Sequence, residues 1–274
     1  MKIGLCLSGG GARGVYHMGV LQAFDDLGLK VSTISGCSAG ALVGTLYSAG
    51  VKPAEMIALA SGTKWFSFLR PALPNRGLIG MEYLDSILKK HIGHNLFEEL
   101  SIPCKVVATS MTKGRVVVFQ QGEIILPVLA SCSVPMLFKP VAINDDHYLD
   151  GGILMNMPAE IIKHECDYLI GVSLMPLYEV AYAEIDSSFK LLSRVLEVSI
   201  HQNSKRQMGL CDLLIESEGI RHHSRFDLKE TDKLFRLGYD EAHASVNRNL
   251  HEMGLSSTEP SNAPDGPEGL RYSL

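Results

Sequence analysis

The chain has 274 residues, and its 25 Lys and Arg against 30 Asp and Glu give a formal charge of −5 at pH 7. This acidic balance excludes a basic footprint for nucleic acid, so no nucleic-acid partner is expected. With 46% hydrophobic residues the chain can fill the core of one α/β domain. No apolar run approaches the roughly 20 residues that a membrane-spanning helix needs, so any membrane contact is expected to be peripheral.

The cysteines and the first residues bear on the compartment in which the protein works. The six cysteines are scattered without a Cys-x-x-Cys pair and lie mostly in apolar runs. This distribution favours reduced core thiols over a disulfide framework or a zinc site. The apolar stretch at residues 1–8 is too short for a signal peptide and is typical of a first strand. We therefore expect a cytoplasmic protein without a bound metal or cofactor.

Hydrophobic periodicity predicts strands and helices along most of the chain. Short β-branched runs between turn residues indicate strands, and apolar residues that recur every three or four positions indicate helices. The expected strands are residues 2–8, 31–34, 104–109, 115–119, 168–174 and 212–216. The expected helices are residues 14–27, 39–49, a stretch from Pro53, 80–92, 123–131, a short one from 158 to 165, 188–208 and 230–253.

Two of these predictions concern places in a sheet. Residues 104–109 and 115–119, joined by a turn that contains Lys113 and Gly114, are expected to pair antiparallel at the edge of the sheet. Residues 168–174 are so apolar that a central strand is expected.

Two further stretches have a distinctive composition. Residues 65–73 combine the only Trp with Phe and aliphatic side chains beside turn residues. That composition suits a lid or acyl-chain wall, and equally the end of a core helix with a connecting loop. Residues 256–274 are polar and rich in Pro and Gly, so a disordered tail is expected, which leaves residues 1–255 as one folded domain.

The first Gly-rich turn, Gly-Gly-Gly-Ala-Arg-Gly at residues 9–14, follows a strand and opens a helix. It satisfies Gly-x-Gly-x-x-Gly, but the acidic residue that holds a ribose is missing, because Ser35 to Ser38 occupy the end of the second strand. The turn also lacks the Lys-Ser/Thr of a phosphate-binding P-loop. The other use of such a turn is to aim backbone N–H groups at an oxyanion, aided by the helix dipole.

The second Gly-rich turn, Gly-Cys-Ser-Ala-Gly at residues 36–40, has the Gly-x-Ser-x-Gly form of a nucleophile elbow. Ser38 is then the candidate nucleophile, and its base must be found elsewhere. Of ten histidines only His147 lies close to a motif-like segment. Asp150 ends an apolar stretch and precedes two glycines that permit a tight turn. Because a carboxylate is a weaker base than imidazole, Asp150 would need direct contact with the Ser38 hydroxyl and partial desolvation that raises its pKa. The motifs alone therefore leave both a histidine and Asp150 as candidates for the general base.

Residues 9–14, 36–40 and 150–152 together resemble the three motifs of the patatin-like phospholipase family, in order and at plausible spacing. The loop at residues 130–135, with Phe138 and Pro140, resembles the connection that precedes the family's aspartate. The resemblance covers residues 3 to about 175. It implies a three-layer α/β/α fold with a mainly parallel central sheet and metal-free hydrolysis of lipid acyl esters.

Carried over position by position, the resemblance implies a Ser-Asp dyad, with Ser38 as nucleophile, Asp150 as general base, and the amides of Gly10, Gly11 and Arg13 lining the oxyanion hole. The supporting motif glycines are Gly9, Gly14, Gly36, Gly40, Gly151 and Gly152. Two alternatives stay open: a Ser-His-Asp esterase, and a lipid-binding or regulatory module with little turnover. The acyl ester and the oligomeric state are not determined at this level.

Overall fold

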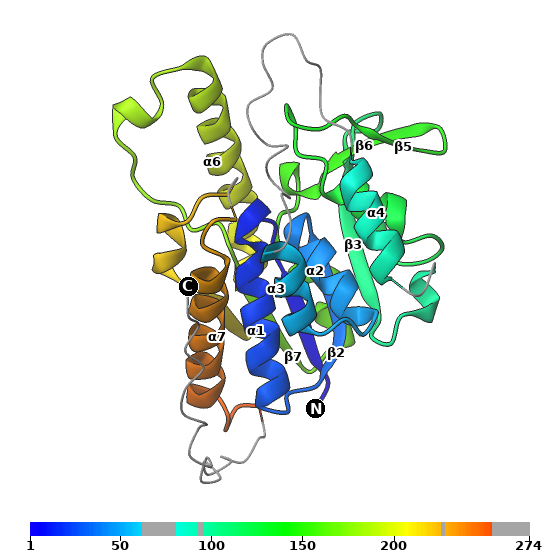
Figure 1. Ribbon diagram of the computed structural model, residues 1–274, viewed down its shortest axis with the longest axis vertical. Helices are drawn as coiled ribbons and strands as arrows, with labels where there is room; N and C mark the ends of the chain where they lie inside the picture. Colours follow the sequence, from blue (N-terminus) through cyan, green and yellow to red (C-terminus); the bar gives the residue numbers. More distant parts are fainter. Residues whose placement is uncertain (62–80, 93–95, 226–227, 254–274) are drawn as a thin grey trace, which may run out of the picture.

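The computed structural model describes residues 1–61, 81–92, 96–225 and 228–253 (Figure 1). The predicted lid at residues 65–73 and the predicted tail at residues 256–274 lie outside the described residues.

The described strands form one sheet of mixed direction. Its strand order is β5-β6-β3-β2-β1-β7-β8, and β4 also pairs with β3. The strands are β1 Ile3–Leu7, β2 Val31–Cys37, β3 Cys104–Ser110, β4 Arg115–Phe119, β5 Val141–Ile143, β6 Asp146–Asp150, β7 Tyr168–Ser173 and β8 Leu213–Glu216. The strands β1, β2, β3, β7 and β8 pair in parallel, while β4, β5 and β6 pair antiparallel. The mainly parallel sheet agrees with the predicted fold class.

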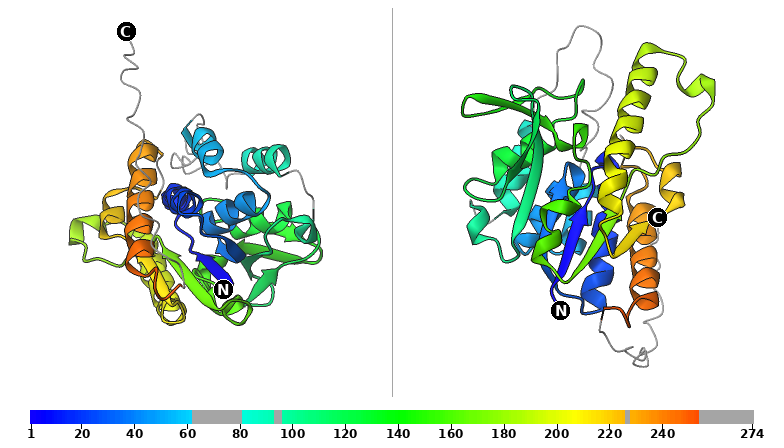
Figure 2. Two further views of the ribbon diagram at one scale, coloured as in Figure 1. Left: turned by 90° about the horizontal axis from the view of Figure 1, so that it is seen from below. Right: turned by 180° about the vertical axis from the view of Figure 1, so that it is seen from behind.

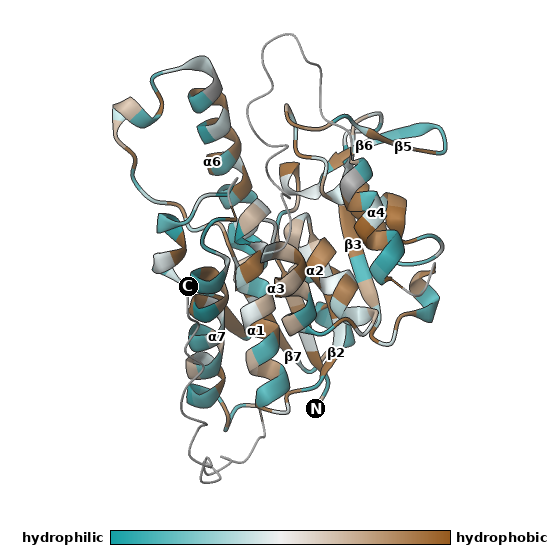
Figure 3. Ribbon diagram, in the orientation of Figure 1, coloured by the Kyte–Doolittle hydropathy of each residue, from teal (hydrophilic) through white to brown (hydrophobic). Residues whose placement is uncertain are grey.

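Most of the helices cover one face of the sheet, and 3₁₀ turns together with the carboxyl-terminal end of α6 cover the other (Figure 2). The helices are α1 Val15–Asp26, α2 Ala39–Ser48, α3 Pro53–Ser61, α4 Glu82–His91, α5 Ile125–Ser131, α6 Ser188–Met208 and α7 Thr231–Arg248. A large core lies between the sheet and the layer that contains α1, α2 and α7. A smaller core on the opposite face includes Cys6, Met157, Ile162 and Leu169, with Met208 at the end of α6 packed against it. Figure 3 shows the hydrophobic residues concentrated in the strands.

Several sequence predictions are confirmed and others need correction. The predicted antiparallel pair is β3 with β4, and β4 pairs with no other strand in the part of the chain that is described. The central strand is β7, which lies buried between β1 and β8. The second strand is longer than predicted because parallel pairing with β3 continues to Cys37. The predicted short helix from 158 to 165 consists of two 3₁₀ turns, Ala159–Ile161 and Lys163–Glu165.

The strands β2 and β6 meet end to end along β3. Cys37, the last residue of β2, pairs with Val107, and Asp150, the last residue of β6, pairs with Ala108. The strand β4 pairs with Val106 to Ser110 of β3, the stretch that includes the partners of Cys37 and Asp150. One edge of β3 therefore carries β4, and the other edge carries both β2 and β6. Therefore β2 and β6 approach from opposite directions on the same side, and their carboxyl ends become neighbours.

Candidate active site

Ser38 lies at the sharp turn between β2 and α2. Its φ of 50° and ψ of −121° are unfavourable for a residue with a side chain. The flanking glycines make this turn possible, because a Cβ at Gly40 would lie 2.2 Å from the carbonyl oxygen of Leu7. The Ser38 amide donates to Ser131 Oγ at 2.8 Å, and that hydroxyl donates to Val107 O at 2.7 Å. These contacts hold the turn in the geometry of a nucleophile elbow.

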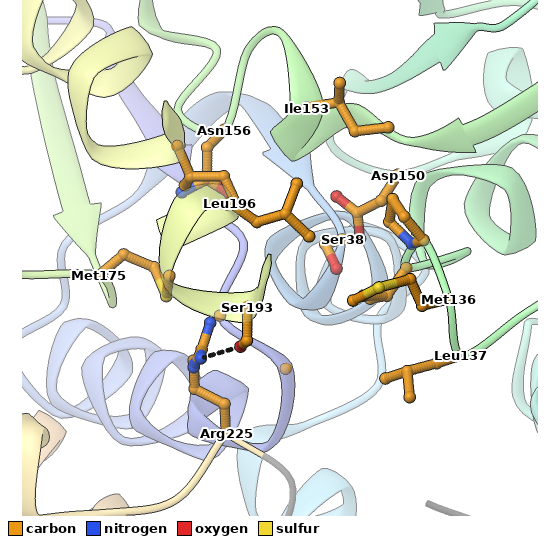
Figure 4. Close-up of a pocket in the computed structure, with 15 residues that line it drawn as sticks. Ser38, Met136, Leu137, Asp150, Ile153, Asn156, Met175, Ser193, Leu196 and Arg225 are labelled. Atoms are coloured by element: carbon orange, nitrogen blue, oxygen red, sulfur yellow. Dashed lines mark hydrogen bonds between the residues drawn. The ribbon is translucent and has the colours of Figure 1, made fainter. Parts of the chain in front are cut away.

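Asp150 lies beside Ser38 in a buried position (Figure 4). Burial raises the pKa of Asp150 to about 6, and contacts with Ser38, the Gly152 amide and Cys37 lower it by less. The Gly152 amide donates to Oδ1 at 2.8 Å, and the Cys37 thiol donates to the same oxygen at 3.7 Å. At neutral pH this carboxyl is ionised but holds protons far more readily than an ordinary aspartate, which suits a general base.

The first Gly-rich turn packs directly against the elbow. A Cβ at Gly14 would lie 2.9 Å from the Ala39 Cβ, so only glycine allows the two turns to approach this closely. Gly11 has a φ of 61°, and Gly10 and Gly11 line the same pocket as Ser38. The two segments predicted to cooperate are therefore side by side.

The third amide predicted for the oxyanion hole is already engaged. The Arg13 amide donates to Gly10 O at 3.3 Å. The Arg13 side chain is buried and points the other way, with Nε donating to His223 O at 2.9 Å and a terminal nitrogen donating to Leu174 O at 3.1 Å. Arg13 thus ties the turn to the chain after β7 and to the segment before α7.

The pocket above Ser38 has a largely apolar wall (Figure 4). Its apolar lining residues are Val134, Pro135, Met136, Leu137, Ile153, Met175, Leu196 and Ile200. Its polar side chains besides Ser38 and Asp150 are those of Asn156, Ser193 and Arg225. Such a wall fits a hydrocarbon chain better than a charged or sugar-like group.

The histidines are not arranged as a base for Ser38, because the described residues that line the pocket include none. His147 is exposed on β6 and lies three residues before Asp150, so the two side chains point to opposite faces of the strand. His17 is buried beneath the glycine turn, where Nε2 donates to Ser8 O at 2.8 Å. Burial lowers the pKa of His17 to about 4, which keeps it neutral.

Sequence reasoning missed three residues that shape the site. Ser131 was noted only as part of a loop, yet it fixes the Ser38 amide. Asn156 holds the first glycine turn, since its carbonyl accepts the Gly9 amide at 3.1 Å. Arg225 does the same from the far end of the chain, where its carbonyl accepts the Ala12 amide at 2.9 Å. The last two carry no motif, so only the tertiary structure reveals them.

Neither a metal site nor a membrane span is found in the described part of the chain. No group of three His, Cys, Asp or Glu side chains there could hold a metal ion. None of the helices in that part is both long and apolar enough to cross a bilayer. The six cysteines lie in the described residues, and all are free thiols.

Comparison with known proteins identifies the family. The patatin-like phospholipase profile matches residues 5–163, more than half of the chain. The chain therefore belongs to the patatin-like phospholipase family, which confirms the resemblance seen in the three motifs.

Two curated relatives match over the same part of the chain. An uncharacterised NTE family protein of Mycobacterium tuberculosis is 33% identical over 177 residues, which cover 63% of this chain and 49% of the relative. Lysophospholipase NTE1 of Cryptococcus neoformans is 31% identical over 172 residues, which cover 59% of this chain and 10% of the relative. The chain thus spans half the length or less of these relatives.

Solved structures share the fold at low sequence identity. VipD from Legionella pneumophila superposes with a TM-score of 0.51 and 17% identity, covering 90% of this chain and 67% of VipD. Human GIVD cytosolic phospholipase A2, in complex with methyl gamma-linolenyl fluorophosphonate, gives a TM-score of 0.51 and 12% identity, covering 92% of this chain and 59% of that protein. The likeness confirms the mixed α/β fold predicted from the motifs.

Proposed function

We propose that this chain is a serine hydrolase that cleaves the carboxylic esters of lipids through Ser38 and Asp150. The observation that carries the proposal is the end-to-end meeting of β2 and β6 on β3, which brings a strained serine and a buried carboxylate together. The apolar pocket wall supports an acyl chain as the bound group. Membership of a phospholipase family supports the same class of reaction.

The first half of the reaction forms an acyl-enzyme. Ser38 Oγ attacks the ester carbonyl carbon while its proton passes to Asp150. The carbonyl oxygen becomes an oxyanion, which the amides of Gly10 and Gly11 stabilise together with the positive end of the helix that follows. The C–O bond to the alcohol then breaks, and the leaving alcohol takes the proton from Asp150.

The second half releases the fatty acid. A water molecule attacks the acyl carbon and gives its proton to Asp150. The tetrahedral intermediate forms at the same amides and collapses by breaking the bond to Ser38 Oγ, which recovers the proton. The Arg13 amide, which the resemblance also assigns to the hole, would have to release the Gly10 carbonyl before it could donate to the oxyanion.

The proposal is tested with a soluble medium-chain nitrophenyl ester and a fluorophosphonate probe. Ser38→Ala and Asp150→Asn should each lower kcat by about 10³-fold or more, since both remove a group that acts in the transition state. Asp145→Asn, at an exposed turn next to the same strand, is the matched control and should retain full activity. The probe should label the wild-type protein and not Ser38→Ala.

Two results would contradict this function. If Ser38→Ala hydrolysed the ester at the wild-type rate, Ser38 would be excluded as the nucleophile. A folded wild-type protein that neither turns over the ester nor reacts with the probe would instead support the lipid-binding or regulatory module.

A further inference from the structure

One side of α6 runs from the wall of the Ser38 pocket to the turn that follows Asp150. Ser193, Leu196 and Ile200 line the pocket at i, i+3 and i+7 spacing (Figure 4). Asn203 comes three residues after Ile200 and therefore lies on the same side of the helix. The family profile ends at residue 163, and none of the three motifs includes this helix.

The Asn203 carboxamide makes three hydrogen bonds to backbone groups that follow Asp150 in the chain. Its Nδ2 donates to Gly152 O at 2.9 Å and to Ile153 O at 3.3 Å, and its Oδ1 accepts the Asn156 amide at 3.1 Å. The partners fix the orientation of the carboxamide, because two carbonyls need donors and one N–H needs an acceptor. Asn203 thus fastens the same turn whose Gly152 amide donates to Asp150 Oδ1.

Asn156 connects Asn203 to the first Gly-rich turn. The Asn156 carbonyl accepts the Gly9 amide at 3.1 Å. The buried side chain of Asn156 fills the space between the two turns, since an added Cβ would lie 2.4 Å from its Oδ1 at Gly9 and 3.0 Å at Gly152. A single side chain of α6 therefore holds the turn after Asp150 directly, and the first Gly-rich turn through one intervening residue.

We propose that Asn203 is a positioning residue for ester hydrolysis, which keeps the turn after Asp150 and the turn of Gly10 and Gly11 at a fixed separation beside Ser38. This role rests on the proposed function, in which Asp150 is the base and the two glycine amides bind the oxyanion. Asn203 contacts neither of these groups itself and acts through the backbone that carries them. Reacting groups need such support, because a displacement of about 1 Å can cost about 100-fold in rate.

Loss of Asn203 should also change the pH at which Asp150 ionises. The hydrogen bond from the Gly152 amide lowers the pKa of Asp150. A looser turn weakens this bond to the charged form, so the pKa of Asp150 should rise further. The titratable side chains that face Asp150 are the thiols of Cys37 and Cys132. Burial raises the pKa of both thiols well above the usual value, so neither titrates near the pKa of about 6 of Asp150.

The test compares Asn203→Ala with Gln207→Ala in the full chain. Gln207 lies one turn further along α6 and is a matched control, because its Oε1 accepts the Glu160 amide at 2.9 Å. Both variants leave backbone groups without a partner and should lower the Tm by a few degrees. Only Asn203→Ala should lower kcat for the soluble ester, by about tenfold, with KM within about twofold of the wild type. Its pH-rate inflection should move up by about half a unit, and that of Gln207→Ala should not move.

Hydrogen exchange followed by mass spectrometry measures the same contacts without turnover. In Asn203→Ala the amides of residues 9–14 and 151–156 should exchange faster than in the wild type, whereas in Gln207→Ala only those near residue 160 should do so. Asn203→Asp is a second variant of the same shape, in case the alanine variant does not fold. It keeps the acceptor for the Asn156 amide but loses both donors, so its kcat should also fall by about tenfold.

Three outcomes would overturn the positioning role. They are a wild-type kcat in Asn203→Ala or Asn203→Asp, an equal loss of kcat in Gln207→Ala, which would trace the effect to general stability, and unchanged exchange at both turns in Asn203→Ala. Failure of the proposed function looks different: the wild-type protein hydrolyses no ester, yet the protection of both turns from exchange still depends on Asn203.

Discussion

Ser38 and Asp150 are each held in an energetically unfavourable state, for which interactions in the rest of the fold must compensate. Ser38 has a positive φ, and Asp150 is a carboxylate moved out of water. Conformational strain and a raised pKa are typical of functional residues, because they keep the reacting groups ready at a cost in stability. The cost is measurable for Asp150, since the shift in its pKa connects the charge to the free energy of unfolding.

Asp150→Asn should make the protein more stable at pH 7. The pKa of the carboxyl rises from 3.8 to about 6 on folding, so the folded protein holds this proton more tightly than the unfolded chain does. Stability is therefore lost as the pH rises from about 4 to 6, by up to about 3 kcal/mol. The variant has no such loss and should gain about 1–3 kcal/mol at pH 7 and almost nothing near pH 4. Urea denaturation at both pH values measures this.

Asp146, at the start of the same strand, is the control with opposite sign. Burial raises its pKa, but hydrogen bonds from Thr112, Ser110 and the His147 amide, with Lys113 nearby, outweigh burial and hold the pKa well below its usual range. Asp146→Asn should lower the free energy of unfolding at pH 7, and the difference from the wild type should shrink as the pH falls. If both substitutions raised stability at pH 7, or both lowered it, the electrostatic explanation would be contradicted.

The rate should follow the ionisation of Asp150. As the proposed base, this carboxyl must be deprotonated, so kcat/KM for the soluble ester should rise with pH through a pKa of about 6 and then level off. A pH-rate profile between 4.5 and 8.5, with the fold checked at each end, measures it. A rate that is lost in His147→Ala but kept in Asp150→Asn would assign the base to a histidine instead.

The candidate site lies where secondary-structure elements end, and glycines determine how closely those ends approach one another. The elbow needs α2 to begin against the end of β1, where Gly40 lies under the Leu7 carbonyl. On the other side, Gly151 lies beside the Val107 carbonyl, where an added Cβ would be 2.5 Å from the oxygen. Close approach of backbone to backbone thus positions both Ser38 and Asp150.

Gly40→Ala should damage both the fold and the catalytic turn. An added Cβ would lie 2.2 Å from a backbone oxygen, which cannot move aside as a side chain could, so α2 must shift and take Ser38 with it. We expect a loss of about 1–3 kcal/mol in the free energy of unfolding and at least tenfold in kcat.

Gly209→Ala, at the end of α6, is the comparison for this variant. Its added Cβ would meet nothing closer than 3.6 Å, and its φ of −67° suits alanine. It should change stability by only a few tenths of a kcal/mol. Equal effects of the two substitutions, by denaturation and by initial rates, would disprove the packing argument.

The whole molecule needs its carboxyl-terminal part to close the core. The family profile ends at residue 163, but the central strand β7 and the helix α7 lie beyond it. The helices α1 and α7 cross closely: a Cβ at Gly19 would lie 2.0 Å from Phe235 O, and one at Gly238 would lie 2.2 Å from Tyr16 O. The buried residues of α7 complete the main core.

Two truncations test where the folded domain ends. A chain that ends at residue 217 lacks α7 and should lose cooperative unfolding, because the buried face of α1 becomes exposed. A chain that ends at residue 255 should keep the full stability and ester rate, since residues 256–274 are polar and rich in Pro and Gly. Circular dichroism with thermal denaturation distinguishes the two. A destabilised 1–255 chain would show that the domain extends further.

The element predictions that depend on local pattern were the most accurate. The structure has α6 at the predicted residues 188–208, and β3 with β4 pair as the runs around Lys113 and Gly114 indicated. The three-residue strand β5 was missed, because a run that short shows no period and forms only through pairing with β6. Arg225 and Asn156 were missed for a related reason, since each acts through backbone contacts with residues distant in the chain.

The sequence by itself determined the family, the fold class and the two turns around which the site is built. Glycines flanking a serine between a strand and a helix have one local geometry, whatever the rest of the chain does. Only the tertiary structure decided which group faces Ser38 and how basic it is. Asp150 reaches Ser38 because β3 aligns two strand ends distant in the sequence, and its pKa rises because the surrounding layers exclude water. Contact and burial of this kind belong to the whole fold and are encoded in no single segment.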